Sequence, residues 1–168
     1  MKEEAARIYV AGNPDLYPLE YYDPESQTYQ GAIPTFLQRF AQEYGYDLCY
    51  YQPGTEDRRD GWAENRQVDL ISGCTENSFY NHTEGEPLVL FSTLTEGEEI
   101  AYLLYFTDVA PSQFQADLRE YAARSSQAEW TGALLKAVET QPAQQSFPLT
   151  LVISLGMVAA LLLSVLLV

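Results

Sequence analysis

Three short apolar runs, each about the length of one strand, are separated by stretches of helical or polar character in the first half of the chain. The runs are Arg7–Gly12, Tyr46–Pro53 and Val68–Cys74. Their apolar residues are nearly continuous instead of alternating with polar ones, which is typical of strands buried on both faces of a parallel sheet. The order strand, helix, strand, helix, strand predicts an α/β fold: a single lobe with a mostly parallel sheet covered by helices on both faces.

The helix expected between the first two runs has a regular apolar face. Its apolar residues recur at i, i+3, i+4, i+7, i+8 and i+11, a spacing that places them on one side of an α-helix. Pro34 suits the first turn, and Gly45 suits the C-cap. Residues 55–67 are polar and predict a second, short helix with Thr55 as a candidate N-cap. The apolar face of the first helix consists of Ile33, Phe36, Leu37, Phe40, Ala41 and Tyr44.

The second half of the chain predicts a strand pair followed by two helices. Residues 87–108 form two extended segments around a Glu-Gly-Glu turn. Pro111 is a typical opening residue for the first of the helices. Ser126 and Glu129 have the spacing of a capping box, which marks the start of the second.

The C-terminal 29 residues, from Thr140 to Val168, carry no charge. Within them, residues 147–168 form an apolar stretch of 22 residues. At a rise of about 1.5 Å per residue this length reaches across the roughly 30 Å hydrocarbon core of a bilayer, and it lacks the period of a surface-lying amphipathic helix. We expect one C-terminal transmembrane helix at 147–168, a linker at 140–146 and the α/β lobe at 1–139. A buried core helix is the alternative.

The charge balance restricts the partners and the location of the lobe. The chain has 24 acidic and 9 basic side chains and a formal net charge of −15. Phosphate binding needs patches of Lys and Arg, so this balance argues against a nucleic-acid partner and against docking on anionic lipid. No Lys or Arg follows Lys136. This favours an extracytoplasmic position for the acidic domain of a single-pass membrane protein.

The chemically reactive residues are few. Cys49, Cys74 and His82 do not have the spacing of a metal site. The two cysteines lie in or beside apolar runs and are interpreted as buried small residues, with a disulfide as the alternative in an exported domain. His82 lies in a polar loop and is interpreted as solvated. Because there is also no serine nucleophile elbow and no phosphate-cradling loop, we predict no enzyme activity, cofactor or metal.

Two loops are the candidates for a binding site, because ligands of open parallel sheets lie at the carboxyl ends of the strands. They follow the first and third runs, where Gly12 and Gly73 allow close backbone approach. Within the first loop, the Asp-Pro-Glu-Ser segment at 23–26 predicts a tight turn between two tyrosine-containing arms. The tyrosines of this loop would form a recognition rim. The alternative is that they pack locally over the sheet, which we favour for Tyr29. The candidate ligand-binding residues are Asn13, Asp15, Tyr17, Tyr22, Gly73, Thr75 and Asn77.

Residues 7–45, "RIYVAGNPDLYPLEYYDPESQTYQGAIPTFLQRFAQEYG", carry a family resemblance. They resemble the first lobe of the extracytoplasmic solute-binding proteins of the amino-acid-binding type (family 3), which have a periplasmic-binding-protein-like fold. Weaker matches at "ENRQVDLISGCTENS" and "LVLFST" extend the resemblance to roughly residue 139. Members of this family are clamshells of two α/β lobes with the ligand between them. The resemblance implies a polar ligand contact at Asn13 and a carboxylate-holding loop at Gly73, Cys74 and Thr75.

The chain departs from the pattern of that family. The arginine that pairs with a ligand carboxylate falls at Tyr80, and the stacking aromatic after the second strand falls at about Glu56. Leu16 takes the place of the aromatic before the loop proline, with Tyr17 beside it. The second lobe is replaced by the Thr-Glu-Gly-Glu-Glu turn at 95–99. Because one lobe covers one side of a ligand, we expect weak binding, or binding completed by a protein partner or a second copy.

These observations predict a membrane-tethered, extracytoplasmic solute-binding-like sensory domain. It would be the ectodomain of a bacterial signalling receptor of the histidine kinase or diguanylate cyclase type, with the output module outside these residues. Its partners would be a small polar solute or a protein, and the membrane through residues 147–168, with a homodimer as a further option. Two alternatives stay open: a protein-interaction or assembly module on a degenerate single-lobe scaffold, whose exposed sheet edges suit strand addition, and a membrane-anchored substrate-binding module of a transporter.

Overall fold

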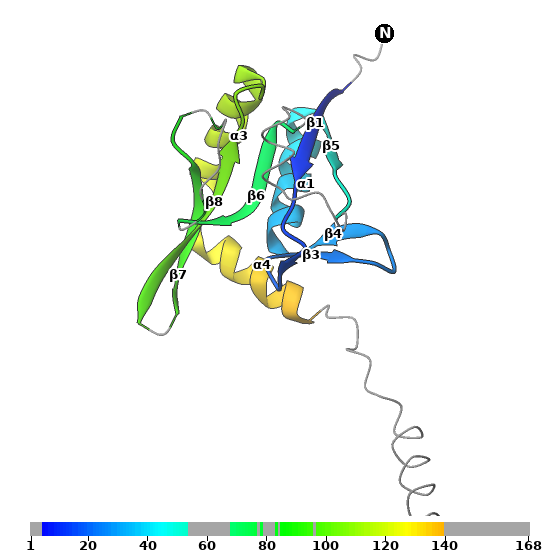
Figure 1. Ribbon diagram of the computed structural model, residues 1–168. Coiled ribbons are helices and arrows are strands. Elements are labelled where there is room, and N and C mark those ends of the chain that lie inside the picture. The colour runs from blue at the N-terminus through cyan, green and yellow to red at the C-terminus, as the bar shows by residue number, and fades with distance from the viewer. Residues whose placement is uncertain are drawn as a thin grey trace, which may run out of the picture. The chain divides into compact units, whose positions relative to one another are not determined.

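A five-stranded sheet forms the centre of the lobe (Figure 1). Its strands, in sheet order, are β5 (Tyr46–Tyr50), β1 (Ala6–Ala11), β6 (Leu70–Thr75), β8 (Glu98–Phe106) and β7 (Leu88–Thr95). β5, β1 and β6 are parallel neighbours, and β8 runs antiparallel between β6 and β7.

The computed structural model describes residues 5–53, 68–76, 78, 83, 85–95 and 97–139. The chain divides into two compact units, Met1–Val138 and Glu139–Val168, and the sheet belongs to the first.

All strands of this sheet except β8 point the same way, so the prediction of a mostly parallel α/β lobe is confirmed. The two extended segments predicted at 87–108 are the antiparallel hairpin of β7 and β8. Its turn includes Gly97, whose φ of 89° lies in the left-handed region that glycine adopts most readily. Figure 1 shows this hairpin extending beyond the other strands.

The described helices form where periodicity and capping residues predict them. α1 (Ala32–Tyr44) ends at Gly45, whose φ is 78° and whose N–H donates to Ala41 O at 2.9 Å. α3 (Ser112–Arg124) follows Pro111. α4 (Gln127–Glu139) begins with the capping box: Ser126 N–H donates to the Glu129 carboxylate at 2.7 Å, and Glu129 N–H donates to Ser126 Oγ at 3.3 Å.

The tyrosine-rich loop folds into a second, small sheet. Its strands β2 (Asp15–Leu16), β3 (Glu20–Asp23) and β4 (Thr28–Gln30) are antiparallel in the order β2-β3-β4. The turn between β3 and β4 is the predicted Asp-Pro-Glu-Ser segment, in which Asp23 accepts a hydrogen bond from Ser26 Oγ at 2.6 Å. The turn was thus predicted from the sequence, whereas the pairing with β2 was not.

The larger apolar core lies between the sheet and the helices. Phe36 of α1 contacts Trp130 of α4 with ring centroids 4.7 Å apart, and Phe40 of α1 contacts Phe114 of α3 at 5.8 Å. A smaller cluster, with Ala11, Val68, Ile71, Cys74 and Leu103, lies on the opposite face, because side chains alternate along a strand.

Several predictions from the sequence concern residues outside the described ranges. They are the helix at 55–67, Asn77, Tyr80, His82, the linker at 140–146 and the transmembrane helix at 147–168. In the described part of the chain, no helix is long and apolar enough to cross a membrane. Cys74 is buried as expected, Cys49 is only partly buried, and both are free thiols, so the disulfide alternative is wrong.

Candidate functional site

The two predicted loops meet at the carboxyl ends of β1 and β6. Asn13 follows β1, and its side-chain amide donates to Gly73 O of β6 at 2.9 Å. The amide oxygen of Asn13 accepts the N–H of Asp15 at 3.1 Å, which fixes the start of β2. Asn13 therefore connects the carboxyl ends of β1 and β6, which lie at the same edge of the sheet because these strands are parallel.

A buried carboxylate lies directly beneath this contact. Glu20, the first residue of β3, is fully buried. Its Oε2 accepts the N–H of Asn13 at 2.8 Å, and its Oε1 accepts the hydroxyl of Ser72 at 2.7 Å. Carboxylates that accept such bonds are held firmly, because an unpaired buried charge is costly. The sequence did not predict a role for Glu20, because its only signal there is an acidic residue between Leu19 and two tyrosines.

Gly73 is required by its surroundings. Its φ is 61°, in the left-handed region, and a Cβ at this position would collide with the carboxylate of Glu20 and lie 2.6 Å from Cβ of Asn13. The predicted close approach at Gly73 is therefore real, and the approaching groups belong to the protein itself.

Tyr50 lies close enough to the buried carboxylate to interact with it electrostatically, and Tyr29 packs against Tyr50. Their rings are stacked with centroids 5.0 Å apart. The hydroxyl of Tyr29 donates to Gly12 O at 3.4 Å, and a Cβ on Gly12 would meet the Tyr29 ring at 2.5 Å. Burial, together with the nearby Glu20, raises the pKa of Tyr50 well above its ordinary value of 10.0. Tyr29 is packed within the lobe, as favoured from the sequence.

Tyr17 and Tyr22 lie further out. Tyr17 is 42% exposed and contacts the ring of Tyr21 at 5.2 Å. Tyr22 is half-buried and meets Tyr29 edge-on at 5.5 Å. Tyr17 thus has the exposure expected of a rim residue, whereas Tyr22 belongs to a row of rings that leads toward β5.

The remaining predicted residues occupy the edges of the site. Asp15 is exposed and pairs with Tyr21 across β2 and β3. Thr75, half-buried at the end of β6, donates its N–H to Ser78 Oγ at 3.1 Å, and its carbonyl accepts the N–H of Ser78 at 2.8 Å. The structure thus joins Asn13 to Gly73 and places Asp15 and Thr75 at the same end of the strands. Asn77 lies outside the described residues.

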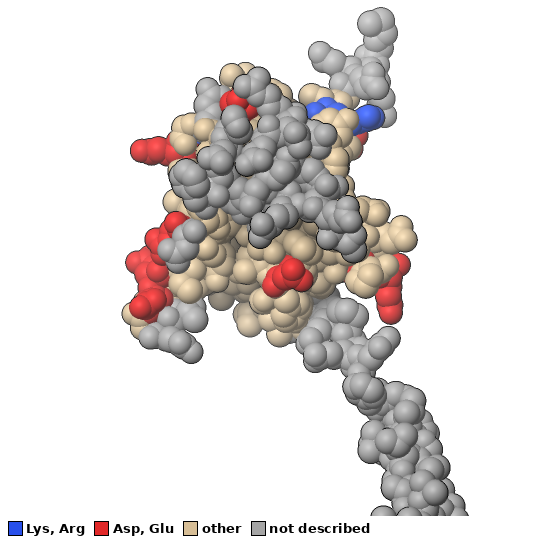
Figure 2. Space-filling view, in the orientation of Figure 1, with Lys and Arg blue, Asp and Glu red and all other residues tan. Residues whose placement is uncertain are grey.

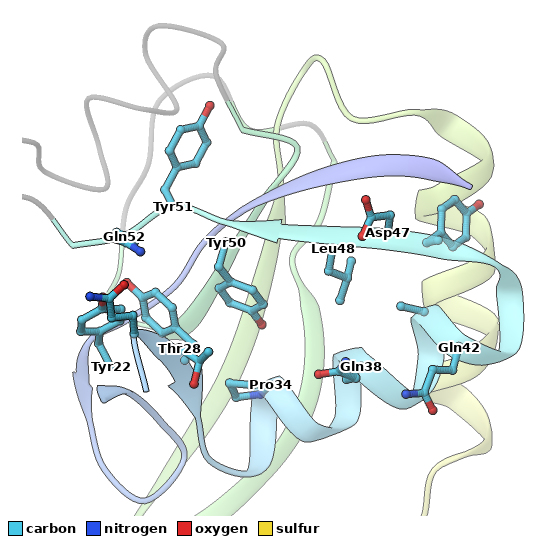
Figure 3. A pocket seen from close by; sticks show the side chains of 14 residues that line it. Tyr22, Thr28, Pro34, Gln38, Gln42, Asp47, Leu48, Tyr50, Tyr51 and Gln52 are labelled. Atoms are coloured by element: carbon cyan, nitrogen blue, oxygen red, sulfur yellow. The ribbon is translucent and has the colours of Figure 1, made fainter. Parts of the chain in front are cut away.

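A groove of about 350 Å³ lies beside this site, between α1, β5 and the β3–β4 hairpin (Figure 3). Of the predicted ligand-binding residues, only Tyr22 lines it. The groove could not be predicted from the sequence, because its residues come from an edge strand and a helix face that each look like ordinary surface.

The charged groups of the described surface do not form a metal site. No group of three His, Cys, Asp or Glu side chains capable of holding a metal ion occurs in the parts that the structure describes. Figure 2 shows the acidic side chains on one face as separate patches.

Comparisons with known proteins identify the fold. No family model and no curated protein matches the sequence. Among solved structures, the arginine-bound form of domain 1 from TmArgBP, in its Phe57Trp mutant, aligns with a TM-score of 0.50 and 17% identity over 78% of this chain and 92% of that one. An amino acid ABC transporter substrate-binding protein, AbpA from Streptococcus pneumoniae, bound to L-arginine, aligns with a TM-score of 0.61 and 10% identity over 80% of this chain and 95% of that one.

These similarities identify the fold of the lobe. The lobe is a single α/β domain of the periplasmic-binding-protein-like type, as the sequence resemblance implied. Both of these similar structures contain bound arginine.

Proposed function

We propose that this chain is a solute-binding domain that acts as an extracytoplasmic sensor, tethered to a membrane through residues 147–168. The observation that carries the proposal is the contact between Asn13 and Gly73 above the buried Glu20. It brings two polar loops together at the carboxyl ends of parallel strands, where ligands of such sheets bind.

A site on one lobe is compatible with this proposal. Domain 1 from TmArgBP was crystallised in an arginine-bound form, so a single lobe of this fold can hold a small solute. In this chain the solute would contact Asn13, Thr75 and the exposed ring of Tyr17. Because these groups can donate and accept hydrogen bonds, we propose a small polar solute such as an amino acid or an amine.

Binding can be tested by thermal unfolding of the full 168-residue chain with a panel of amino acids, amines and organic acids. A ligand of the native state raises Tm in a saturable way by mass action. Replacing Thr75 by valine exchanges the hydroxyl for a methyl group of similar size and should weaken the response. The matched variant Thr93→Val, on β7, should leave it unchanged. A flat response to the whole panel would contradict the proposal.

A protein-interaction module is the second candidate, favoured by the edge strand β7. Val89 and Leu94 on this strand are 55% and 77% exposed. An edge strand with exposed apolar residues is a template for pairing with another chain. Sedimentation of the full chain over a range of concentrations should then show self-association that Leu94→Lys abolishes. A concentration-independent monomer would exclude self-pairing through β7.

A further inference from the structure

The groove between α1 and β5 differs in charge from the rest of this acidic chain. Asp47 is the only described ionisable carboxylate that lines it, and no described Lys, Arg or His does. The Asp47 carboxylate lies 3.4 Å from the guanidinium of Arg7. An ion pair leaves little net charge for a ligand to neutralise, so the groove favours an uncharged molecule.

One wall of the groove is a continuous row of tyrosine rings. Tyr22 meets Tyr29 edge-on at 5.5 Å, and Tyr29 stacks on Tyr50 at 5.0 Å. Because the rings contact one another, they leave no space between them for a cation, and they do not form an aromatic cage. A row of this kind packs well against a flat ligand face that is rich in C–H groups.

The opposite wall is polar and comes from one side of α1. Pro34, Gln38 and Gln42 are spaced at i, i+4 and i+8, so they share a helix face. Figure 3 shows Pro34 and Gln38 across the open space from Leu48 and Tyr50 of β5. Among the described residues, the structure gives no hydrogen-bond partner to the side-chain amide of Gln38 or Gln42. Each amide has two donors and an acceptor, which can match neighbouring hydroxyl groups.

We propose that this groove is a second binding site, separate from the strand-end site, and that it takes a neutral polyhydroxylated ligand, namely a mono- or disaccharide. The C–H face of a sugar ring would lie against the tyrosine row, and its hydroxyls would bond to Gln38 and Gln42. The volume of about 350 Å³ lies near the lower limit of typical ligand pockets, which suits a small sugar. The groove site does not depend on the solute proposed for Asn13 and Thr75.

The test is calorimetric titration of the full chain with D-glucose, N-acetyl-D-glucosamine and cellobiose, in a detergent that has no sugar headgroup. We expect saturable binding of at least one sugar. Because no ionic contact is involved, its affinity should not change between about 0.05 and 0.5 M NaCl. Choline and succinate serve as the cationic and anionic comparisons, and a neutral extended pentapeptide tests strand addition at the free edge of β5.

Variants link the binding to the groove. The double variant Gln38→Leu and Gln42→Leu removes both amides from exposed positions and should weaken sugar binding about tenfold or more. The control variant Gln127→Leu, exposed at the start of α4 outside the groove, should bind like the unmodified chain. Tyr22→Leu, which shortens the tyrosine row, should also weaken binding.

Three results would overturn the proposal. They are the absence of saturable binding with all three sugars, an affinity that the glutamine double variant leaves unchanged, and tighter binding of choline, succinate or the pentapeptide than of any sugar. If Thr75→Val loses the thermal response to the solute panel but still binds sugar, the strand-end site and the groove bind independently.

Discussion

At the scale of single residues, the buried carboxylate of Glu20 organises the strand-end site. Its oxygens accept bonds from Asn13 N–H and from Ser72 Oγ. Glu20→Gln keeps the size of the side chain but replaces one acceptor with a donor, so we expect a loss of about 1.5–3 kcal/mol in the free energy of unfolding. Urea denaturation measures this loss. Glu25→Gln, exposed in the β3–β4 turn, is the control and should change stability by less than about 0.5 kcal/mol. An equally small effect of Glu20→Gln would show that the hydrogen bonds of Glu20 do not stabilise the fold.

Two glycines with similar positive φ angles allow the cost of the left-handed backbone to be measured apart from the cost of crowding. Gly73 has a φ of 61° and a Cβ there would be crowded by Glu20 and Asn13, whereas Gly85 has a φ of 69° and a Cβ there would meet open space. Gly85→Ala should cost only the backbone penalty of about 1–2 kcal/mol. Gly73→Ala adds overpacking and should cost about 3 kcal/mol or more. Equal costs in chemical denaturation would show that Glu20 does not pack against Gly73.

The hydroxyl of Tyr46 predicts a pH dependence. It donates to the Asp117 carboxylate at 2.7 Å, and burial with this bond raises the pKa of Tyr46 from 10.0 to about 12. Below pH 10 both the folded and the unfolded chain keep this proton. Between pH 10 and about 12 the unfolded chain loses it first, so stability falls as the pH rises.

Tyr46→Phe tests this dependence. The variant should lose about 0.5–1.5 kcal/mol at neutral pH, and the difference from the unmodified chain should shrink as the pH rises from 10 toward 12. Denaturation at a series of pH values gives both quantities. Tyr17→Phe, at an exposed ring, is the control and should change stability at neutral pH by less than about 0.5 kcal/mol. A constant difference across the alkaline range would contradict the raised pKa.

At the scale of elements, the capping box explains where α4 begins. Ser126 and Glu129 exchange hydrogen bonds at the N-terminus of the helix. Ser126→Ala should destabilise the chain by about 0.5–2 kcal/mol in thermal unfolding. Ser112→Ala is the control, because Ser112 is the first residue of α3 and the N-cap of that helix, Pro111, makes no side-chain cap. If Ser126→Ala and Ser112→Ala lowered the stability by the same amount, the capping box would have no role in stability.

The elements differ in how well the sequence predicted them. α1, α3 and the start of α4 followed from local signals: apolar spacing, Gly45, Pro111 and the capping box. The small sheet was only half predicted, because the pairing of β2 with β3 depends on contacts between segments. Glu20 shows the same limit at a single position, since its burial depends on Ser72, which lies 52 residues further along the chain. Local pattern predicts helices and turns, but it does not predict which polar group is covered by a distant strand.

At the scale of the whole lobe, the sheet order explains the position of both sites. β1 lies between β5 and β6, so the loop after β1 is brought against the end of β6, where Asn13 meets Gly73. β5 is an edge strand, so the space beside α1 stays open as a groove. The described helices all contribute to the core on one face of the sheet, although the sequence predicted helices on both faces. The predicted second helix, at 55–67, lies outside the described residues.

The central claim is that the joined ends of β1 and β6 bind a small solute. The most direct test is to follow the backbone amide signals of the full chain by NMR while adding each amino acid or amine of the panel. We predict saturable shifts at Asn13, Gly73 and Thr75 with at least one solute, and unchanged signals at Gly85 and Gly97. If no solute shifts the first three signals, or if their shifts depend only on protein concentration, the lobe does not bind solutes at this site.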